Sequence, residues 1–160
     1  MQEVYAPEFL RAKLVQHAPA LLPLLSSDPA LFEALQKPRL SRGLQRQSLR
    51  RTFLDAQAAV GDEGELLAQL RRLRHRFVVR VALREILQLA GIDETSAELA
   101  YLAEAATDAA LQWSLRQTAL EQGALRDPEG KAIPLVALGM GKLGGEELNF
   151  GSDIDLCFFY

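Results

Sequence analysis

Apolar residues recur three or four positions apart through most of the first 123 residues, and this spacing ends abruptly at Gly123. It is clearest between Glu65 and Ala90, where the apolar side chains would lie on one face of a helix. The same spacing predicts further helices over residues 7–17 and 41–60, and from residue 93 or 95 to about 123. Residues 1–123 are therefore expected to form a helical region.

Capping residues indicate where several of these helices begin and end. Asp28 is expected to cap a helix that has Pro29 in its first turn and ends at Pro38. Asp93 or Thr95 is expected to cap the last helix. The three longest helices are expected to end at Gly61, at Gly91 and near Gly123.

A different pattern begins after Gly123. Residues 124–132 contain Asp127-Pro128 and Gly130 and are typical of a turn-rich connector. Residues 133–138 and 154–160 are predicted to be strands on either side of a glycine-rich loop. The expected fold class is α+β, with a helical region followed over residues 133–160 by the start of a mixed sheet. Because two strands rarely form a stable sheet alone, we expect the natural sequence to continue.

Composition indicates a protein of the cytoplasm. The 160 residues are 49% hydrophobic and 24% charged, which is typical of a globular domain. No apolar run is long enough to cross a membrane, and the start lacks the pattern of a secretory signal. The single cysteine, Cys157, has no partner for an internal disulfide, so a reducing compartment fits best.

Arginines gather in two blocks although the net charge is −3. One block lies in residues 39–51 and the other in residues 71–84. Arg71, Arg72, Arg74 and Arg76 would lie around much of a helix, and no phenylalanine, tyrosine or tryptophan is interleaved among them as on a stacking surface. A solvated or domain-packing role is favoured over nucleic-acid binding. We expect these arginines to pair with acidic surfaces of a later domain or of a protein substrate.

The residues with the clearest chemistry are Asp153 and Asp155. Residues two apart on a strand share a face, so both carboxylates would point the same way. Ile154, Leu156 and Phe158 would then face a core. Paired carboxylates suit a hard cation such as Mg²⁺, held together with phosphate oxygens, and we expect them to bind this metal.

Gly144 and Gly145 precede this pair by a short interval, with seven residues between Gly145 and Asp153. The two glycines are expected to follow a loop and to precede a short helix over residues 146–148, whose N-terminus would face a phosphate. Lys142 is either a phosphate ligand or a solvated side chain. Ser152 either caps a turn, which is favoured, or touches phosphate. Cys157 is expected to be a small core residue rather than a nucleophile.

The segment Gly139-Met-Gly-Lys-Leu-Gly-Gly145, with Glu147-Leu-Asn-Phe150 and Ser152-Asp-Ile-Asp-Leu156, resembles the signature of glutamine synthetase adenylyltransferases. This family is similar to the wider DNA polymerase β-like nucleotidyltransferases. The resemblance is close over the 24 residues 137–160 that contain these motifs. It implies that Asp153 and Asp155 bind Mg²⁺ and that Gly144 and Gly145 hold the phosphate of ATP, ADP or inorganic phosphate. A third carboxylate is expected beyond Tyr160, so the chain alone is expected to be inactive.

Members of this family carry two catalytic units, which add AMP to glutamine synthetase and remove it by phosphorolysis. The position of the motif near Met1 implies the first, adenylyl-removing unit, and a PII-type signalling protein as regulator. Two alternatives stay open. The chain could belong to another nucleotidyltransferase, such as a uridylyl-transferring nitrogen sensor, or be a non-catalytic helical binding module.

Overall fold

The computed structural model describes residues 5–26, 31, 35 and 40–160. Within them the chain forms, in order, α1 (Pro7–His17), η1 (Pro19–Leu21), α2 (Leu22–Ser26), α4 (Arg46–Ala58), α5 (Glu63–Ile86), α6 (Ile92–Gln122), β1 (Val136–Met140), α7 (Gly141–Gly144) and β2 (Asp155–Phe159). The fold class is α+β, as predicted. The expected helix caps Asp28, Pro29 and Pro38 lie outside the described residues.

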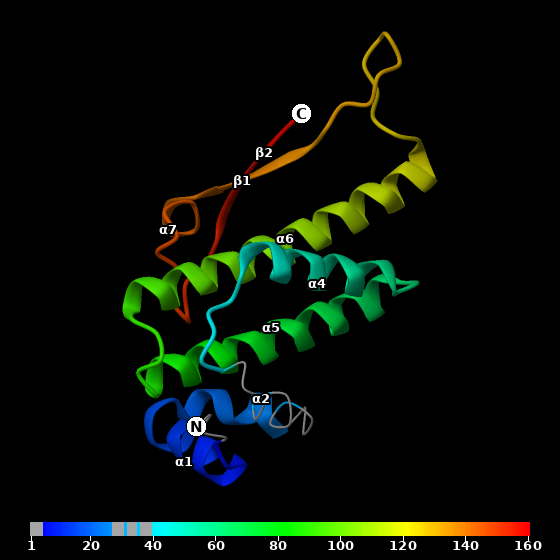
Figure 1. Cartoon of the computed structure of the whole chain (residues 1–160). Coiled ribbons are helices and arrows are strands. Elements are labelled where there is room, and N and C mark those ends of the chain that lie inside the picture. Colours follow the sequence, from blue (N-terminus) through cyan, green and yellow to red (C-terminus); the bar gives the residue numbers. More distant parts are fainter. Residues whose placement is uncertain (1–4, 27–30, 32–34, 36–39) are drawn as a thin grey trace.

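The helices α4, α5 and α6 pack against one another, and the two strands lie on the side of α6 that faces away from α1 (Figure 1). α1 and α2 contact α5 at the opposite end of the molecule. None of the helices in the described part of the chain is long and apolar enough to cross a membrane.

Two apolar clusters lie on either side of α5. One contains Val79 and Leu83 with leucines of α1, and the other contains Val78 and Val81 with side chains of α4 and α6. Because helix positions three or four apart share a face, α5 can present a different apolar face to each cluster. The second cluster also includes Leu143 and Leu148, so the glycine-rich segment is packed onto the helical core.

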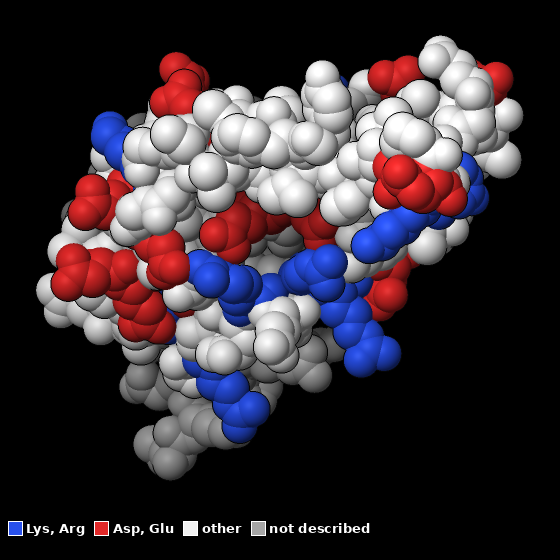
Figure 2. Space-filling model, turned by 90° about the horizontal axis from the view of Figure 1, so that it is seen from above, with Lys and Arg blue, Asp and Glu red and all other residues white. Residues whose placement is uncertain are grey.

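Many arginines of the two basic blocks are paired within the chain. Arg50 Nε lies 2.7 Å from Asp108 Oδ2, and Arg46 Nε lies 3.1 Å from Glu104 Oε2. Both arginines belong to α4 and both acids to α6. Figure 2 shows basic and acidic side chains gathered around a hollow in this face. The domain-packing interpretation therefore holds for these arginines, with partners in this chain rather than in a later domain.

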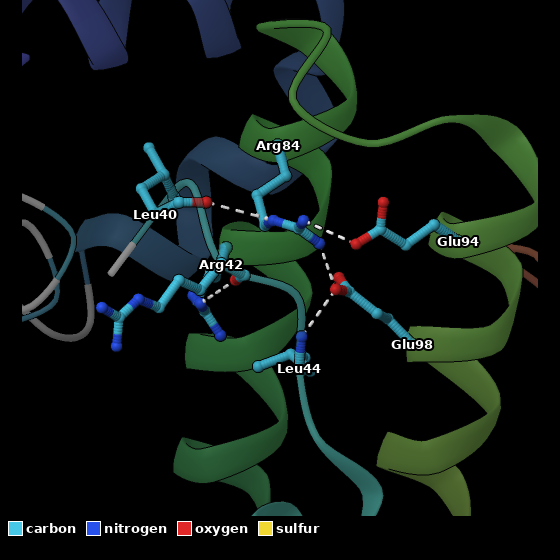
Figure 3. A network of polar contacts seen from close by, with 7 residues as sticks. Leu40, Arg42, Leu44, Arg84, Glu94 and Glu98 are labelled. Atoms are coloured by element: carbon cyan, nitrogen blue, oxygen red, sulfur yellow. Dashed lines mark hydrogen bonds and ion pairs between the residues drawn. The ribbon is translucent and has the colours of Figure 1, made fainter. Parts of the chain in front are cut away.

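Arg84 of α5 is buried and joins the segment before α4 to α6 (Figure 3). Its guanidinium donates to the backbone carbonyl of Leu40 and pairs with Glu94 and Glu98. Glu98 also accepts a hydrogen bond of 2.7 Å from the backbone N–H of Leu44. This network fixes the chain between Leu40 and Leu44 against α5 and α6.

The network explains why α4 begins at Arg46 and not at residue 41 as predicted. The backbone carbonyls of Leu40 and Arg42 accept from side chains of α5, and the N–H of Leu44 donates to Glu98 of α6. These backbone groups are therefore satisfied by other helices rather than by a helical turn of their own.

The ends of α5 differ in how they are capped. Asp62 accepts a hydrogen bond of 2.9 Å from the N–H of Glu65, which starts the helix two residues before the predicted position. The predicted end at Ala90 is wrong. Gln88 adopts a φ of 57°, and its N–H bonds to the Glu85 carbonyl while that of Leu89 bonds to Arg84. This pair of bonds is a Schellman end, formed here without a glycine.

The start of α6 also differs from the prediction. The helix begins at Ile92, its capping residue is Gly91, and no side chain caps it. Thr95 lies inside the first turn with its side chain buried, so neither Asp93 nor Thr95 is the cap. Gly91 therefore starts α6 instead of closing α5, because Gln88 has already ended that helix.

Candidate functional site

The two strands bring Asp155 to the glycine-rich loop. β1 and β2 are antiparallel, with Met140 opposite Asp155 and Gly139 opposite Leu156. Asp155 is the first residue of β2, and Asp153 precedes the strand by two residues. A Cβ atom built on Gly141 would lie 3.7 Å from Asp155 Oδ2. The carboxylate of Asp155 therefore lies beside the turn that follows β1.

The local structure of the glycine loop differs from the prediction. The helical turn, α7, spans Gly141–Gly144 and so comes before Gly145 instead of after it. The predicted helix over residues 146–148 is absent from this described segment, because Glu146 has a φ of 58° and ends the turn. The helical turn therefore starts at Gly141, beside the Asp155 carboxylate.

Close packing of the backbone explains the glycine at position 144. A Cβ on Gly144 would lie 2.6 Å from the carbonyl oxygen of Gly139, which is closer than any real contact. Gly141 has a φ of 54°, a conformation that glycine adopts without strain. Both glycines are thus required by the fold of the loop itself. The phosphate-binding role of Gly144 and Gly145 stays a prediction.

The other predicted loop residues are placed clearly. Ser152 Oγ accepts a hydrogen bond of 3.1 Å from the N–H of Asn149, and its own N–H donates to the Asn149 carbonyl. Ser152 therefore closes a turn, which confirms the favoured interpretation. Lys142 is exposed on α7.

Only part of the expected core side of β2 is buried. Leu156 packs against the helical cluster as predicted, but Ile154 and Phe158 are 39% and 54% exposed. Cys157 is exposed as well, so the expectation that it is a core residue is wrong. Within the described residues only the first part of β2 reaches the helices, and nothing covers the face that carries Asp155 and Cys157.

A hollow of about 610 Å³ lies between α4, α6 and β1. Of the predicted site residues only Gly144 lines it. Arg46 and Glu146 form part of its wall together with apolar residues of the strands. The hollow is therefore beside the candidate carboxylate site rather than at it.

Sequence reasoning missed Glu146, which connects the glycine loop to the helices. Its carboxylate pairs with the Arg46 guanidinium and accepts a hydrogen bond of 3.1 Å from the hydroxyl of Tyr101. Burial and the nearby Glu146 carboxylate outweigh the attraction of Arg46 and raise the pKa of Glu104. Burial and the bond to Glu146 raise the pKa of Tyr101. Nothing in the spacing of these residues indicated that they would meet.

The chemistry of the two aspartates fits a divalent cation. Both side chains are exposed, separated by one residue, and free of ion pairs within the described residues. Oxygen ligands of this kind are those that Mg²⁺ prefers. The described residues hold no cluster of three metal-ligating side chains.

The family model described as glutamate–ammonia ligase adenylyltransferase matches residues 11–160. The match spans both the helical region and the strand–glycine–strand unit, and it places the chain among the adenylyltransferases. The chain belongs to the glutamate–ammonia ligase adenylyltransferase family. The resemblance drawn from residues 139–156 is thereby confirmed.

Two curated relatives carry the name bifunctional glutamine synthetase adenylyltransferase/adenylyl-removing enzyme. The protein of Thioalkalivibrio sulfidiphilus (strain HL-EbGR7) is 43% identical over 130 residues, which are 81% of this chain and 13% of that protein. The protein of Shewanella loihica (strain ATCC BAA-1088 / PV-4) is 47% identical over 103 residues, which are 64% of this chain and 11% of that protein. The matched segments are thus a small part of both relatives.

Proposed function

We propose that this chain forms part of the adenylyl-removing site of an enzyme that acts on glutamine synthetase. The observation that carries the proposal is the position of Asp155 beside Gly141, with Asp153 two residues away. The names of the relatives supply both the reaction class and the protein substrate.

In the proposed reaction an oxygen of inorganic phosphate attacks the phosphorus of AMP-tyrosine. A new P–O bond forms, the bond to the tyrosine oxygen breaks, and the tyrosine oxygen takes up a proton. The products are ADP and the unmodified tyrosine side chain of glutamine synthetase. Magnesium, when bound, neutralises charge on the phosphate oxygens. Asp153 and Asp155 would hold the metal, while Gly144, Gly145, Lys142 and Ser152 would lie around the phosphates.

Phosphorolysis, rather than AMP transfer from ATP, is the direction that we propose, and both activities stand in the names of the relatives. A PII-type signalling protein is the regulator that we propose, and the cytoplasm is the proposed compartment. Activity with adenine nucleotides rather than uridine nucleotides would distinguish this function from that of a uridylyl-transferring enzyme. Absence of magnesium-dependent nucleotide binding would favour a non-catalytic helical module.

The test uses the longest natural protein that contains this chain, with adenylylated glutamine synthetase and phosphate as substrates. We expect Asp153→Asn and Asp155→Asn each to lower phosphate-dependent ADP release about 100-fold or more, because each removes a charge that would hold the metal. Asp55→Asn is the matched control, since Asp55 is an exposed acid of α4. Full activity in either variant would contradict the proposed site.

The 160-residue chain by itself is expected to release no ADP, because the superfamily resemblance places a third carboxylate outside these residues. ADP release by the isolated chain would contradict that expectation. If Asp155→Asn abolished adenylyl transfer from ATP and left phosphorolysis unchanged, the proposed direction would be wrong while the carboxylate site would stand.

A further inference from the structure

We propose that Arg46, Tyr101 and Glu146 act as positioning residues, which hold the glycine-rich loop in the conformation that receives phosphate. The proposal rests on the proposed function for the identity of the ligand. Its structural part, that these residues hold the loop, stands on the contacts alone. None of the three is among the residues predicted to touch metal or phosphate.

The contacts converge on Glu146 from two helices. Arg46 of α4 pairs with one carboxylate oxygen, and the Tyr101 hydroxyl of α6 donates to the other at 3.1 Å. The Arg46 guanidinium also stacks over the Tyr101 ring at 4.5 Å from the centroid and lies 3.1 Å from Glu104. A planar guanidinium can make all of these contacts at once, which a lysine ammonium would not reproduce.

Glu146 is held in an uncommon backbone conformation. Its φ of 58° lies in the left-handed region, which residues other than glycine rarely adopt. Such conformations persist where surrounding contacts fix them, and they gather at functional sites. Here the fixing contacts are the two helix side chains, and the residue held is the one directly after Gly145.

The loop has two apolar attachments on either side of this polar one. Leu143 and Leu148 are both buried in the helical cluster. They fix the ends of the segment, whereas Glu146 fixes its middle. Gly145 donates to the Gly141 carbonyl at 3.0 Å, and a Cβ on Gly141 would lie beside Asp155. Movement of Glu146 would therefore shift the turn at Gly141, which lies beside the Asp155 carboxylate.

The arginines of the hollow do not form a separate anion site. Arg46 and Arg50 are each paired with acids, and the acids outnumber them there, with Glu104, Asp108 and Glu146. The charges therefore serve to join α4, α6 and the loop.

The experiment compares Glu146→Gln, Arg46→Gln and their double variant. Backbone amide exchange over residues 141–147 is measured in the 160-residue chain, and affinity for ADP in the presence of MgCl₂ in the longest natural protein that contains it. We expect each single variant to speed loop exchange and to weaken ADP binding about tenfold. The double variant should be no worse than either single one, because both break the same contact.

Arg50→Gln is the matched control. It breaks the neighbouring ion pair between α4 and α6, to Asp108, and does not touch the loop. It should lower thermal stability as Arg46→Gln does while leaving loop exchange and ADP affinity unchanged. The proposal would be overturned if Arg50→Gln changed loop exchange and ADP affinity as much as Arg46→Gln does. It would also be overturned if Glu146→Gln left loop exchange unchanged.

The two proposals fail in different ways. If Asp155→Asn leaves ADP binding intact, or no ADP binds at all, the proposed function fails, and loop exchange still decides whether the three residues hold the loop. If Asp155→Asn abolishes binding while Glu146→Gln leaves both readouts unchanged, the carboxylate site stands and the positioning role fails.

Discussion

At the scale of single residues, Arg84 and Arg50 show how far burial changes the role of the same side chain. Arg84 is 1% exposed and pairs with the equally buried Glu98. Arg50 is largely exposed in its pair with Asp108. A buried charge that loses its partner keeps its desolvation cost, whereas an exposed one is solvated by water.

We expect Arg84→Met to lower the free energy of unfolding by about 3–5 kcal/mol, because it leaves the Glu98 carboxylate buried without a cation. Arg50→Met should cost about 1 kcal/mol or less. Adding Glu98→Gln to Arg84→Met should recover part of the loss, since a neutral amide can still accept from the Leu44 N–H. Urea unfolding measures all three, and similar losses at positions 84 and 50 would contradict this account.

At the scale of elements, α5 has an end that a glycine would suit better. Gln88 has a φ of 57° and makes the backbone bonds that close the helix. The left-handed conformation costs an ordinary residue free energy that glycine does not lose.

The basic block of the same helix surrounds His75, where burial and the neighbouring Arg74 and Arg71 lower the histidine pKa.

Gln88→Gly is expected to raise the free energy of unfolding by about 1 kcal/mol, through relief of the left-handed strain. Ala68→Gly is the control, because Ala68 is exposed inside α5, where glycine should cost about 1 kcal/mol. Thermal unfolding gives both values. A loss of stability in Gln88→Gly would show that a contact of the Gln88 side chain stabilises the fold by more than the left-handed conformation costs.

His75 should make the chain less stable in mild acid. Its folded-state pKa lies below the ordinary value of 6.5, so the unfolded chain binds the proton more readily. The folded state therefore loses stability as pH falls through about 6.5 and below. Urea midpoints at about pH 7.5 and pH 5.5 should differ less in His75→Gln than in the parent chain. If the two urea midpoints differed as much in His75→Gln as in the parent chain, groups other than His75 would cause the loss of stability in acid.

At the scale of the whole molecule, the strand–glycine–strand unit and the helical region share one core. Leu143 and Leu148 lie in the same cluster as Phe53, Leu99 and Leu102. The unit that carries Asp153 and Asp155 is thus supported by helices far from it in the sequence. Its stability is expected to depend on that contact, since two strands alone are rarely stable.

Leu143→Ala should lower the free energy of unfolding of the chain by about 2–5 kcal/mol, as expected for a buried leucine. Leu138→Ala is the control on β1, because Leu138 is 50% exposed and should change stability by about 0.5 kcal/mol or less. Circular dichroism during urea unfolding reports the helices directly. No effect of Leu143→Ala on helix unfolding would show that the two parts unfold separately.

The sequence by itself determined the class of the long helices and of the two strands. Helical spacing predicted α1, α4, α5 and α6 with ends that differ from the structure by up to five residues, and the change after Gly123 predicted two strands around a glycine loop. It also singled out Asp153 and Asp155 as the candidate metal ligands. These features depend on neighbours in the chain, because periodicity and glycine content act over a few residues.

Only the tertiary structure decided the ends of these elements and what meets the loop. α4 starts late because Arg84 and Glu98 bind the backbone before it, and α5 ends early at Gln88. Glu146 meets Arg46 across 100 positions of sequence. Such contacts join residues whose distance along the chain is unrelated to their distance in space, so no local pattern indicates them.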